Sequence, residues 1–158
     1  MTVHVTPSGS RGARIPNVPA WLWRVLNAIG EIVFRVFGKR MRVAGRPVLL
    51  LETVGARSGA RRRTILCWFP YRESSWIIVA SRAGDARHPG WFHNLARNPE
   101  RVWITFPGGT RLKVRPESLR GTERDQEWRE VVKVSPQYAK YEDATDRVIP
   151  LIRLVREG

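Results

Sequence analysis

The chain has one cysteine, three histidines and half as many acidic as basic residues. Cys67 has no second cysteine with which to form a disulfide within the chain. His4, His88 and His93 share no metal-ligand spacing with it, so we expect no metal. Cys67 lies in the apolar run TILCWF, which favours a buried side chain over a nucleophile.

A long hydrophobic run is also lacking. Crossing a bilayer takes about 20 mostly apolar residues, and no segment of this chain provides them. The opening MTVHVTPSGSRGARIP is polar and lacks the apolar centre of a secretory signal peptide, so we expect a cytoplasmic protein. Residues 1–20 are rich in Gly, Pro, Ser and Arg, which predicts a mobile basic arm.

The charge balance is strongly basic. The 158 residues hold 28 Lys and Arg against 14 Asp and Glu, a formal net charge of +14. This excess favours an acidic partner: nucleic acid, an anionic membrane surface, or a ligand with phosphate or carboxylate groups. Most of the basic residues are arginines, whose forked guanidinium suits phosphate and carboxylate better than lysine does.

Residues 21–40 predict an amphipathic helix, because apolar side chains recur at helical period with charged residues mostly opposite them. Two interpretations of the apolar face stay open. It packs on the domain core or on a second copy of the chain, or it lies in a membrane interface with Trp21 and Trp23 as anchors. The second would place the protein peripherally on the inner face of the cell membrane.

From residue 47 the pattern changes to short runs of β-branched and aromatic residues, which predict strands joined by hairpins. The expected strands are residues 47–54, 62–73, 75–81, 101–106, 110–117 and 147–155, and the expected helices are residues 88–99 and 122–136. Hairpins with helices at the ends and one inserted predict an α+β domain built on a small barrel, covering residues 41–158.

The segment TVGARSGARRRT, residues 53–64, places strong positive charge at a tight turn. Its glycines let the backbone come close to a ligand, and Ser58 offers a hydroxyl. Alternation along a strand puts Arg61 and Arg63 on one face and Arg62 on the other. The pattern describes an anion cradle, and it also describes a solvated basic hairpin.

A second small and basic group, Ala80 to Gly84, follows a predicted strand, and the helix that begins near Pro89 adds free N–H groups there. Together the two groups suggest a ligand with a charged tail and a flat polar head. No Ser-His-Asp order or paired carboxylate is evident, and the candidate proton donors, Tyr138 and Tyr141, also suit surface positions on a helix. Such a chain leaves the chemistry to a cofactor.

The motifs G-x-[RK]-S-G, A-S-[RK], P-x-W-[FY]-x-N-L-x-x-N-P, Y-x-x-Y and D-R-x-I-P occur in this order over residues 40–155. As a set they resemble the deazaflavin-dependent nitroreductase family, actinobacterial reductases that use coenzyme F420, an 8-hydroxy-5-deazaflavin. The resemblance implies a split β-barrel and hydride transfer from the reduced deazaflavin to a small hydrophobic, electron-poor acceptor. Quinones, activated enones and nitro-aromatic compounds are the acceptors it suggests.

The resemblance also implies a site. It places the phosphate and glutamate tail of F420 at Arg57, Ser58 and Arg62, and the ring beside residues 80–82. The cofactor-binding residues that it implies are Arg57, Ser58, Gly59, Arg62, Thr64, Ile65, Ala80, Ser81, Arg82, Trp91, Asn94 and Tyr141, and the catalytic ones are Tyr138, Tyr141 and Ser81. Two positions depart from the family pattern, Ala56 where a basic residue is frequent and Ile65 where some members have proline.

Other functions compete with this one. Seven tryptophans and the net charge would suit a basic nucleic-acid-binding module with stacking platforms, although most aromatics lie in apolar runs. A barrel of this kind could also hold a flavin nucleotide or a haem, or carry F420 without catalysis. We expect F420 and a small acceptor as partners, no nucleic acid, and leave a homodimer open.

Overall fold

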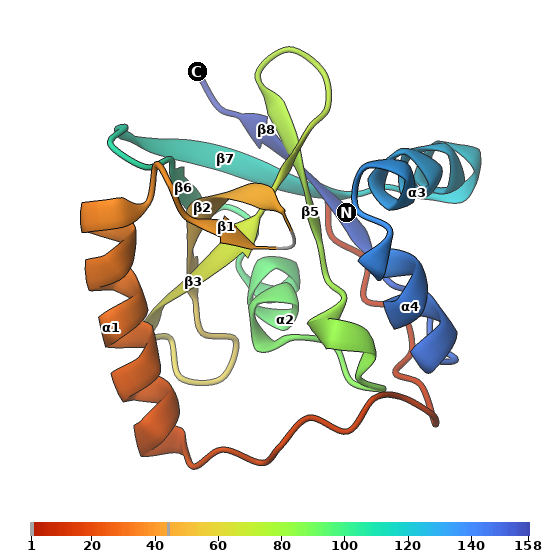
Figure 1. The fold of residues 1–158 in the computed structure, drawn as a ribbon. Coiled ribbons are helices and arrows are strands. Elements are labelled where there is room, and N and C mark those ends of the chain that lie inside the picture. The colour runs from red at the N-terminus through yellow and green to blue at the C-terminus, as the bar shows by residue number, and fades with distance from the viewer. Residues whose placement is uncertain (1, 44) are drawn as a thin grey trace.

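The computed structural model describes residues 2–43 and 45–158, and there it shows eight strands in one antiparallel sheet with helices packed around it (Figure 1). The strands are β1 (Arg42–Val43), β2 (Arg46–Val54), β3 (Arg61–Cys67), β4 (Phe69–Pro70), β5 (Ser75–Val79), β6 (Trp103–Thr105), β7 (Arg111–Ser118) and β8 (Leu151–Arg156). The helices are α1 (Ala20–Phe37), the 3-10 turn η1 (Arg82–Gly84), α2 (Gly90–Arg97), α3 (Gly121–Val134) and α4 (Gln137–Ala144). The sheet order is β1-β2-β6-β7-β8-β5-β4, and β3 pairs with β2 outside that path.

The sheet curls because the chain passes directly between its two ends. β3 ends at Cys67 beside β2, and β4 begins at Phe69 beside β5. Consecutive Cα atoms are about 3.8 Å apart, so one intervening residue keeps these edges close together. The α+β class and the small barrel predicted from the sequence are confirmed.

Alternation along the strands sends side chains into two hydrophobic cores. Ile78 of β5 and Ile152 of β8 pack in the core that contains α2. Their neighbours Ile77, Val79 and Leu151 pack in the second core, with α3 and α4. The two faces of the sheet are thus covered by different helices, as Figure 1 shows.

Most predicted elements correspond to observed ones, with several differences. The short strand β1 was not predicted, and the predicted helix 21–40 ends at Phe37. The predicted strand 62–73 is divided into β3 and β4 at Trp68. The predicted strand 147–155 begins only at residue 151, after Pro150, which has no N–H to donate to a ladder. Residues 137–144 form a helix of their own, α4, which separates the two tyrosines from α3.

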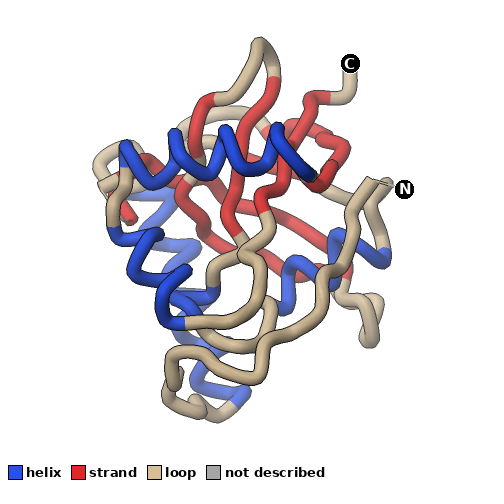
Figure 2. Tube along the Cα trace, turned by 90° about the vertical axis from the view of Figure 1, so that its right-hand side faces the viewer, coloured by secondary structure: helices blue, strands red, loops and turns tan. Residues whose placement is uncertain are grey.

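Residues 2–19 form no helix or strand and run as a long loop along the domain (Figure 2). Val3 is buried in the core that contains α2. The amides of Gly9 and Ala13 each donate a 2.8 Å hydrogen bond to a carbonyl in the segment after β5. The mobile arm expected for residues 1–20 stays a prediction, and residue 1 lies outside the described residues.

Helix α1 leaves most of its apolar face uncovered. Phe34 is buried, but Trp21, Ile32 and Val36 are 64%, 61% and 65% exposed. The core of the same chain therefore covers little of this face. The described part of the chain supports core packing for only part of this face, around Phe34.

Candidate functional site

Two hollows lie on either side of the N-terminus of α2. The first, of about 680 Å³, opens between α2 and the turn that joins β2 to β3. Its described lining contains three arginines and no carboxylate, so we call it the anion cradle. The lining residues are Gly55, Ala56, Arg57, Ser58, Arg62, Gly90, His93, Asn94, Ala96 and Arg97.

The turn beside the anion cradle is closed by its own backbone. Gly55 N donates to Ala60 O (2.8 Å), and Gly59 N donates to Gly55 O (2.9 Å). Gly59 has φ of 66°, a left-handed conformation that glycine adopts without strain. Ser58 Oγ accepts from Arg62 Nη2 and would stand only 2.5 Å from a Cβ at Gly55. The glycines are therefore required for this shape.

Asn94 ties the same turn to α2. Its Oδ1 accepts from Ala56 N (2.9 Å), and its Nδ2 donates to Thr53 Oγ1 (3.1 Å). One helical turn later, Asn98 Nδ2 donates to Val54 O (3.1 Å). The two asparagines of the N-L-x-x-N motif thus hold the turn of the anion cradle against α2. The sequence alone could not distinguish this supporting role from ligand binding.

The three consecutive arginines divide as strand alternation predicts. Arg61 and Arg63 each form an ion pair with Glu52 at 3.4 Å. Arg62 lies on the opposite face and lines the anion cradle. Of the three, Arg62 is therefore the one whose charge faces a ligand there.

The second hollow, of about 210 Å³, lies between β3, the segment after β5, and α4. Trp91 on its wall belongs to one hydrophobic core, and Cys67 and Val79 belong to the other. Apolar walls with a few polar groups suit a flat, partly polar ring, so we call it the ring cavity. Its lining residues are Val43, Ile65, Leu66, Cys67, Val79, Ser81, Arg82, Ala83, Pro89, Trp91, Gln137, Tyr138 and Tyr141.

The two hollows are lined by neighbouring positions of the same two elements. On β3, Arg62 lines the anion cradle and Ile65 the ring cavity. At the start of α2, Gly90 lines the first and Pro89 and Trp91 the second. No side chain caps this helix end, and although Phe92 N donates to Pro89 O (3.1 Å), the N–H groups of Gly90 and Trp91 can meet an anion. One elongated ligand with an anionic tail and a flat head can occupy both.

Tyr138 is held in the wall of the ring cavity. It is only 4% exposed, and its hydroxyl lies 2.8 Å from Cys67 Sγ. Burial raises the pKa of Tyr138 well above its usual value, and the adjacent Cys67 adds to this shift. Burial likewise raises the pKa of the Cys67 thiol. Both groups are therefore protonated at neutral pH, and the expected burial of Cys67 is confirmed.

Tyr141 and Ser81 are more accessible, since both are half-buried. Tyr141 Oη accepts a 3.4 Å hydrogen bond from Gln137 Nε2. Ser81 precedes two residues in the left-handed region, Arg82 with φ of 44° and Ala83 with φ of 51°. Such angles are uncommon outside glycine and are frequent where a loop shapes a site.

Most of the residues expected from the resemblance lie at one of the two hollows. Thr64 and Ala80 line neither, and Ala80 is fully buried with its carbonyl bonded to Arg147. Gly59 shapes the turn without lining the cradle. The expected residues that line the anion cradle are Arg57, Ser58, Arg62 and Asn94, and those that line the ring cavity are Ile65, Ser81, Arg82, Trp91, Tyr138 and Tyr141.

Three polar residues were missed. His93 and Arg97 line the anion cradle, and Gln137 lines the ring cavity one helical turn before Tyr141. The spacing of Arg97 from Asn94 and of Gln137 from Tyr141 could have identified these two. Among the described residues, no cluster of His, Cys, Asp and Glu could hold a metal ion.

Comparisons with known proteins agree with this geometry. Residues 31–156 match the model of the F420H(2)-dependent quinone reductase family. The chain is 33% identical over 148 residues to an F420H(2)-dependent quinone reductase of Mycobacterium tuberculosis (strain H37Rv), covering 89% of this chain and 99% of the relative.

Two solved structures are also similar. One is the F420-H2 dependent reductase FDR-A, with 35% identity and a TM-score of 0.60 over 69% of this chain and 94% of that one. The other is a domain-swapped dimer, with 31% identity and a TM-score of 0.61 over 85% of this chain and 99% of that one. The expected split β-barrel is confirmed.

Proposed function

The chain belongs to the F420H2-dependent quinone reductase family, and we propose that its anion cradle and ring cavity together hold coenzyme F420. The protein is accordingly an oxidoreductase that uses this cofactor, as the sequence predicts. Its acceptor is an electron-poor molecule of the quinone type. The observation that carries the proposal is the pair of hollows joined along β3 and the start of α2.

The residues present fit the cofactor at both ends. The three arginines of the cradle suit its phosphate and glutamate carboxylates, because guanidinium groups bind such anions through paired hydrogen bonds. A Cβ placed on Gly90 would meet nothing within 4 Å, so the backbone at the start of α2 is open to a phosphate. In the ring cavity, apolar walls with Ser81 and Gln137 suit a flat ring with polar edges.

Bound reduced F420 supplies a hydride, and the protein orients the reactants and excludes water. Tyr141 is the best placed proton donor, because its oxygen accepts from Gln137 and its own hydrogen can point into the cavity. Ser81 is the second candidate on the same wall. Tyr138, bonded to Cys67, shapes the wall and is poorly suited to release a proton.

A fluorescence titration with F420 is expected to saturate, and menadione is expected to oxidise F420H2 when the protein is added. FMN is the matched control, because it has a similar ring and a phosphate but no glutamate tail, and we expect it to bind more weakly. F420 binding without oxidation by menadione would contradict quinone reduction and favour a carrier. Failure to bind F420 would overturn the whole proposal.

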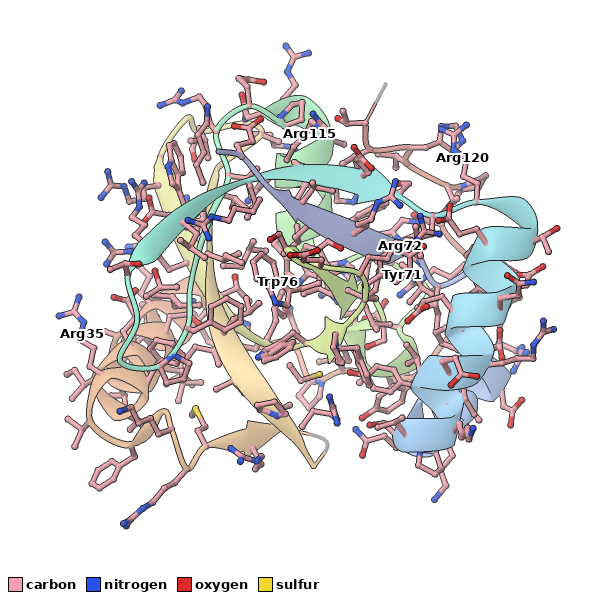
Figure 3. The ribbon with its side chains drawn as sticks, turned by 90° about the horizontal axis from the view of Figure 1, so that it is seen from above. Arg35, Tyr71, Arg72, Trp76, Arg115 and Arg120 are labelled. Carbon is pink, nitrogen blue, oxygen red and sulfur yellow. The ribbon has the colours of Figure 1, made fainter. Side chains whose placement is uncertain are left out.

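Nucleic-acid binding is not favoured. The arginines project around the whole molecule and are not gathered on one face, as Arg35, Arg115 and Arg120 show at separate edges in Figure 3. The tryptophans with the largest exposure, Trp21 and Trp23, lie on α1 and not in the anion cradle. The basic groove and the exposed aromatic side chains therefore lie on different surfaces, whereas binding of single-stranded nucleic acid combines them in one.

The uncovered face of α1 is proposed to meet a second copy of the chain, which a similar structure described as a domain-swapped dimer supports. Ile32→Glu is expected to convert a dimer into a monomer in analytical ultracentrifugation, because burying a lone carboxylate in an apolar contact is unfavourable. Asn27→Glu, on an exposed position of the same helix, is the control and should leave the dimer intact.

A monomeric wild-type protein would contradict this assignment. Flotation with anionic vesicles then measures the alternative, a peripheral contact with the inner face of the cell membrane. None of the helices in the described part of the chain has the length and apolar content to cross a bilayer.

A further inference from the structure

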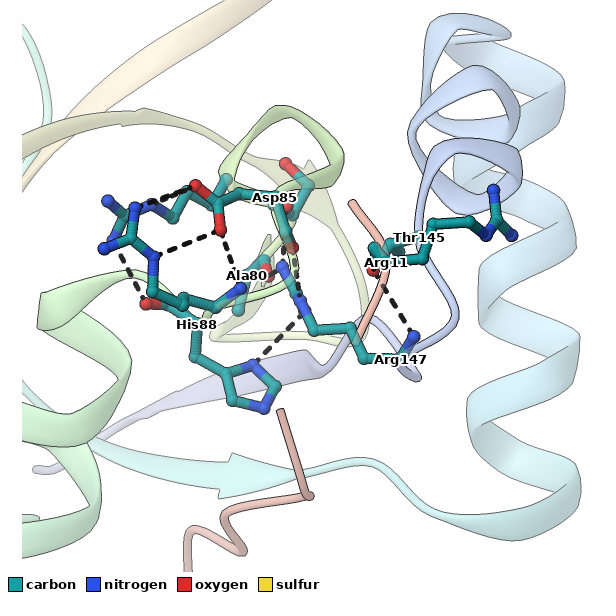
Figure 4. A network of polar contacts seen from close by, with 9 residues as sticks. Arg11, Ala80, Asp85, His88, Thr145 and Arg147 are labelled. Atoms are coloured by element: carbon teal, nitrogen blue, oxygen red, sulfur yellow. Dashed lines mark hydrogen bonds and ion pairs between the residues drawn. The ribbon is translucent and has the colours of Figure 1, made fainter. Parts of the chain in front are cut away.

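Residues 81–88, here called the ring loop, are hydrogen-bonded to one buried arginine, Arg147 (Figure 4). Arg147 is 5% exposed. Its Nη2 donates to the carbonyls of Ala80 (3.1 Å) and Ser81 (2.7 Å), and its Nε donates to the carbonyl of Asp85 (2.8 Å). Burying a guanidinium is energetically unfavourable unless its N–H groups form hydrogen bonds. These contacts therefore hold the start of the loop and its middle, at Asp85, at a fixed separation.

His88 extends this network to the N-terminal part of the chain. Its Nδ1 lies 3.2 Å from Arg147 Nη1, and its Nε2 lies 2.8 Å from the carbonyl of Thr6. A guanidinium can only donate, so Nδ1 accepts, and the single proton of the neutral ring is on Nε2, where it donates to Thr6. His88 therefore joins Arg147 to residue 6 only when it is neutral.

Backbone hydrogen bonds also hold residues 2–13, here called the N-terminal segment, against the ring loop. The amides of Gly9 and Ala13 donate to two carbonyls of the loop, each at 2.8 Å. The N-terminal segment is also bonded to the chain after α4. The backbone carbonyl of Arg11 accepts a hydrogen bond from Thr145 Oγ1 (2.9 Å), and the backbone amide of Arg11 donates to Asp146 Oδ1 (2.9 Å). The segment thus bridges the ring loop and the chain just after α4.

The ring loop needs such support. Arg82 and Ala83 both line the ring cavity and both have positive φ, a strained backbone conformation for residues other than glycine. We propose that Arg147 and His88 are positioning residues through which the N-terminal segment holds the ring loop in the shape that receives the cofactor ring. This inference rests on the proposed function, and it gives residues 2–13 a role in the site.

A pH dependence follows from the tautomer of His88. The charged groups around it are Arg147 and, in its own loop, Arg82, Asp85 and Arg87, and the titratable ring of His93 on α2 also lies near it. A second proton on Nδ1 would face the guanidinium and break that bond. Burial lowers the pKa of His88, and the positive charge of Arg147 lowers it further. Together they outweigh the hydrogen bond to the Thr6 carbonyl, which raises the pKa.

The direction of the pH effect is fixed by this shift. Because the folded-state pKa is lowered, the contribution of neutral His88 is complete above about pH 6.5, its ordinary value. It is lost as the pH falls through the lower folded value. The ring loop is therefore expected to loosen in mildly acidic solution.

Gly12→Ala tests the proposal without changing the ring cavity. A Cβ at Gly12 would lie 2.1 Å from Ala86 N, so the segment must move away from the loop. In cofactor-free protein, the amides of Gly84 and Asp85 are expected to exchange hydrogen about tenfold faster, with α3 unchanged. The dissociation constant for F420 is expected to rise about tenfold. Ser8→Ala, an exposed position of the same segment, is the control.

His88→Gln supplies a second variant that keeps an uncharged donor for the Thr6 carbonyl. Wild-type protein is expected to lose protection of the ring loop as the pH falls below about 6.5, and His88→Gln is expected to lose this pH dependence. Unchanged exchange in Gly12→Ala, or the same pH dependence in His88→Gln, would overturn the proposal. Faster exchange in a protein that does not bind F420 would instead overturn the cofactor assignment and leave the positioning role intact.

Discussion

Replacing Arg57 and Arg62 together by alanine is expected to weaken F420 binding by about a hundredfold or more. Each hydrogen bond to a charged group contributes ~1.5–3 kcal/mol, and ~1.4 kcal/mol is tenfold in the dissociation constant. No carboxylate in the described lining of the anion cradle offsets their charge. A fluorescence titration with F420 at two salt concentrations measures the effect, and the loss should shrink at high salt because exposed charges are screened.

Arg61→Ala is the matched control, since it removes the same charge from the neighbouring position. Arg61 pairs with Glu52 on the opposite face of β3 and does not line the cradle. Its replacement should change F420 affinity by less than about twofold, as expected for a distant surface charge. An equal loss in Arg61→Ala would mean that net charge, and not the geometry of the cradle, attracts the cofactor.

Glu52→Gln is expected to lower the free energy of unfolding by about 2 kcal/mol, because it leaves the arginines around Glu52 without their shared carboxylate. Glu52 is 7% exposed and bonds Arg63 and Arg111 in addition to its ion pair with Arg61. The effect stays below that of a fully buried pair, since these arginines are partly exposed to solvent. Urea denaturation measures it.

Acid should remove the same contribution from the wild-type protein. Burial raises the pKa of Glu52, but the bonds and charges of Arg111, Arg61 and Arg63 outweigh burial and bring it below its ordinary value. The stabilisation is therefore complete above about pH 4.3 and lost as the pH falls through the lower folded value. Glu73→Gln, at the exposed turn before β5, is the control. Equal stability of Glu52→Gln and wild type at pH 7 would contradict the role of Glu52.

The parts of the site that depend on neighbouring residues could be predicted from the sequence. The glycines and Ser58 of the turn, and the division of the three arginines between two faces, follow from local backbone geometry and strand alternation. These features are fixed within a few residues, so the chain alone specifies them. The anion cradle was accordingly recognisable, although which of its residues bind and which support, as for Asn94, was not.

The remaining parts depend on contacts between distant segments. Thr6 and His88 are 82 positions apart, and Arg11 and Asp146 are 135 positions apart. Composition predicts a mobile arm over residues 1–20 and cannot report these contacts of residues 6 and 11, because their partners occur far along the sequence. The burial of Tyr138 against Cys67 likewise depends on how α4 packs on β3, which no local pattern reports.

The direct run of β3 from the anion cradle to the ring cavity has a consequence for ligand selection. Cys67 lies five positions after Arg62 in β3, roughly 17 Å along the strand. A strand paired along its length cannot stretch or shorten, so the distance between these two backbone positions is constant. If F420 occupies both hollows as proposed, molecules whose spacer between the anionic and aromatic parts is too short are expected to reach one hollow only. Ligand length as well as ligand chemistry would then decide which molecules bind.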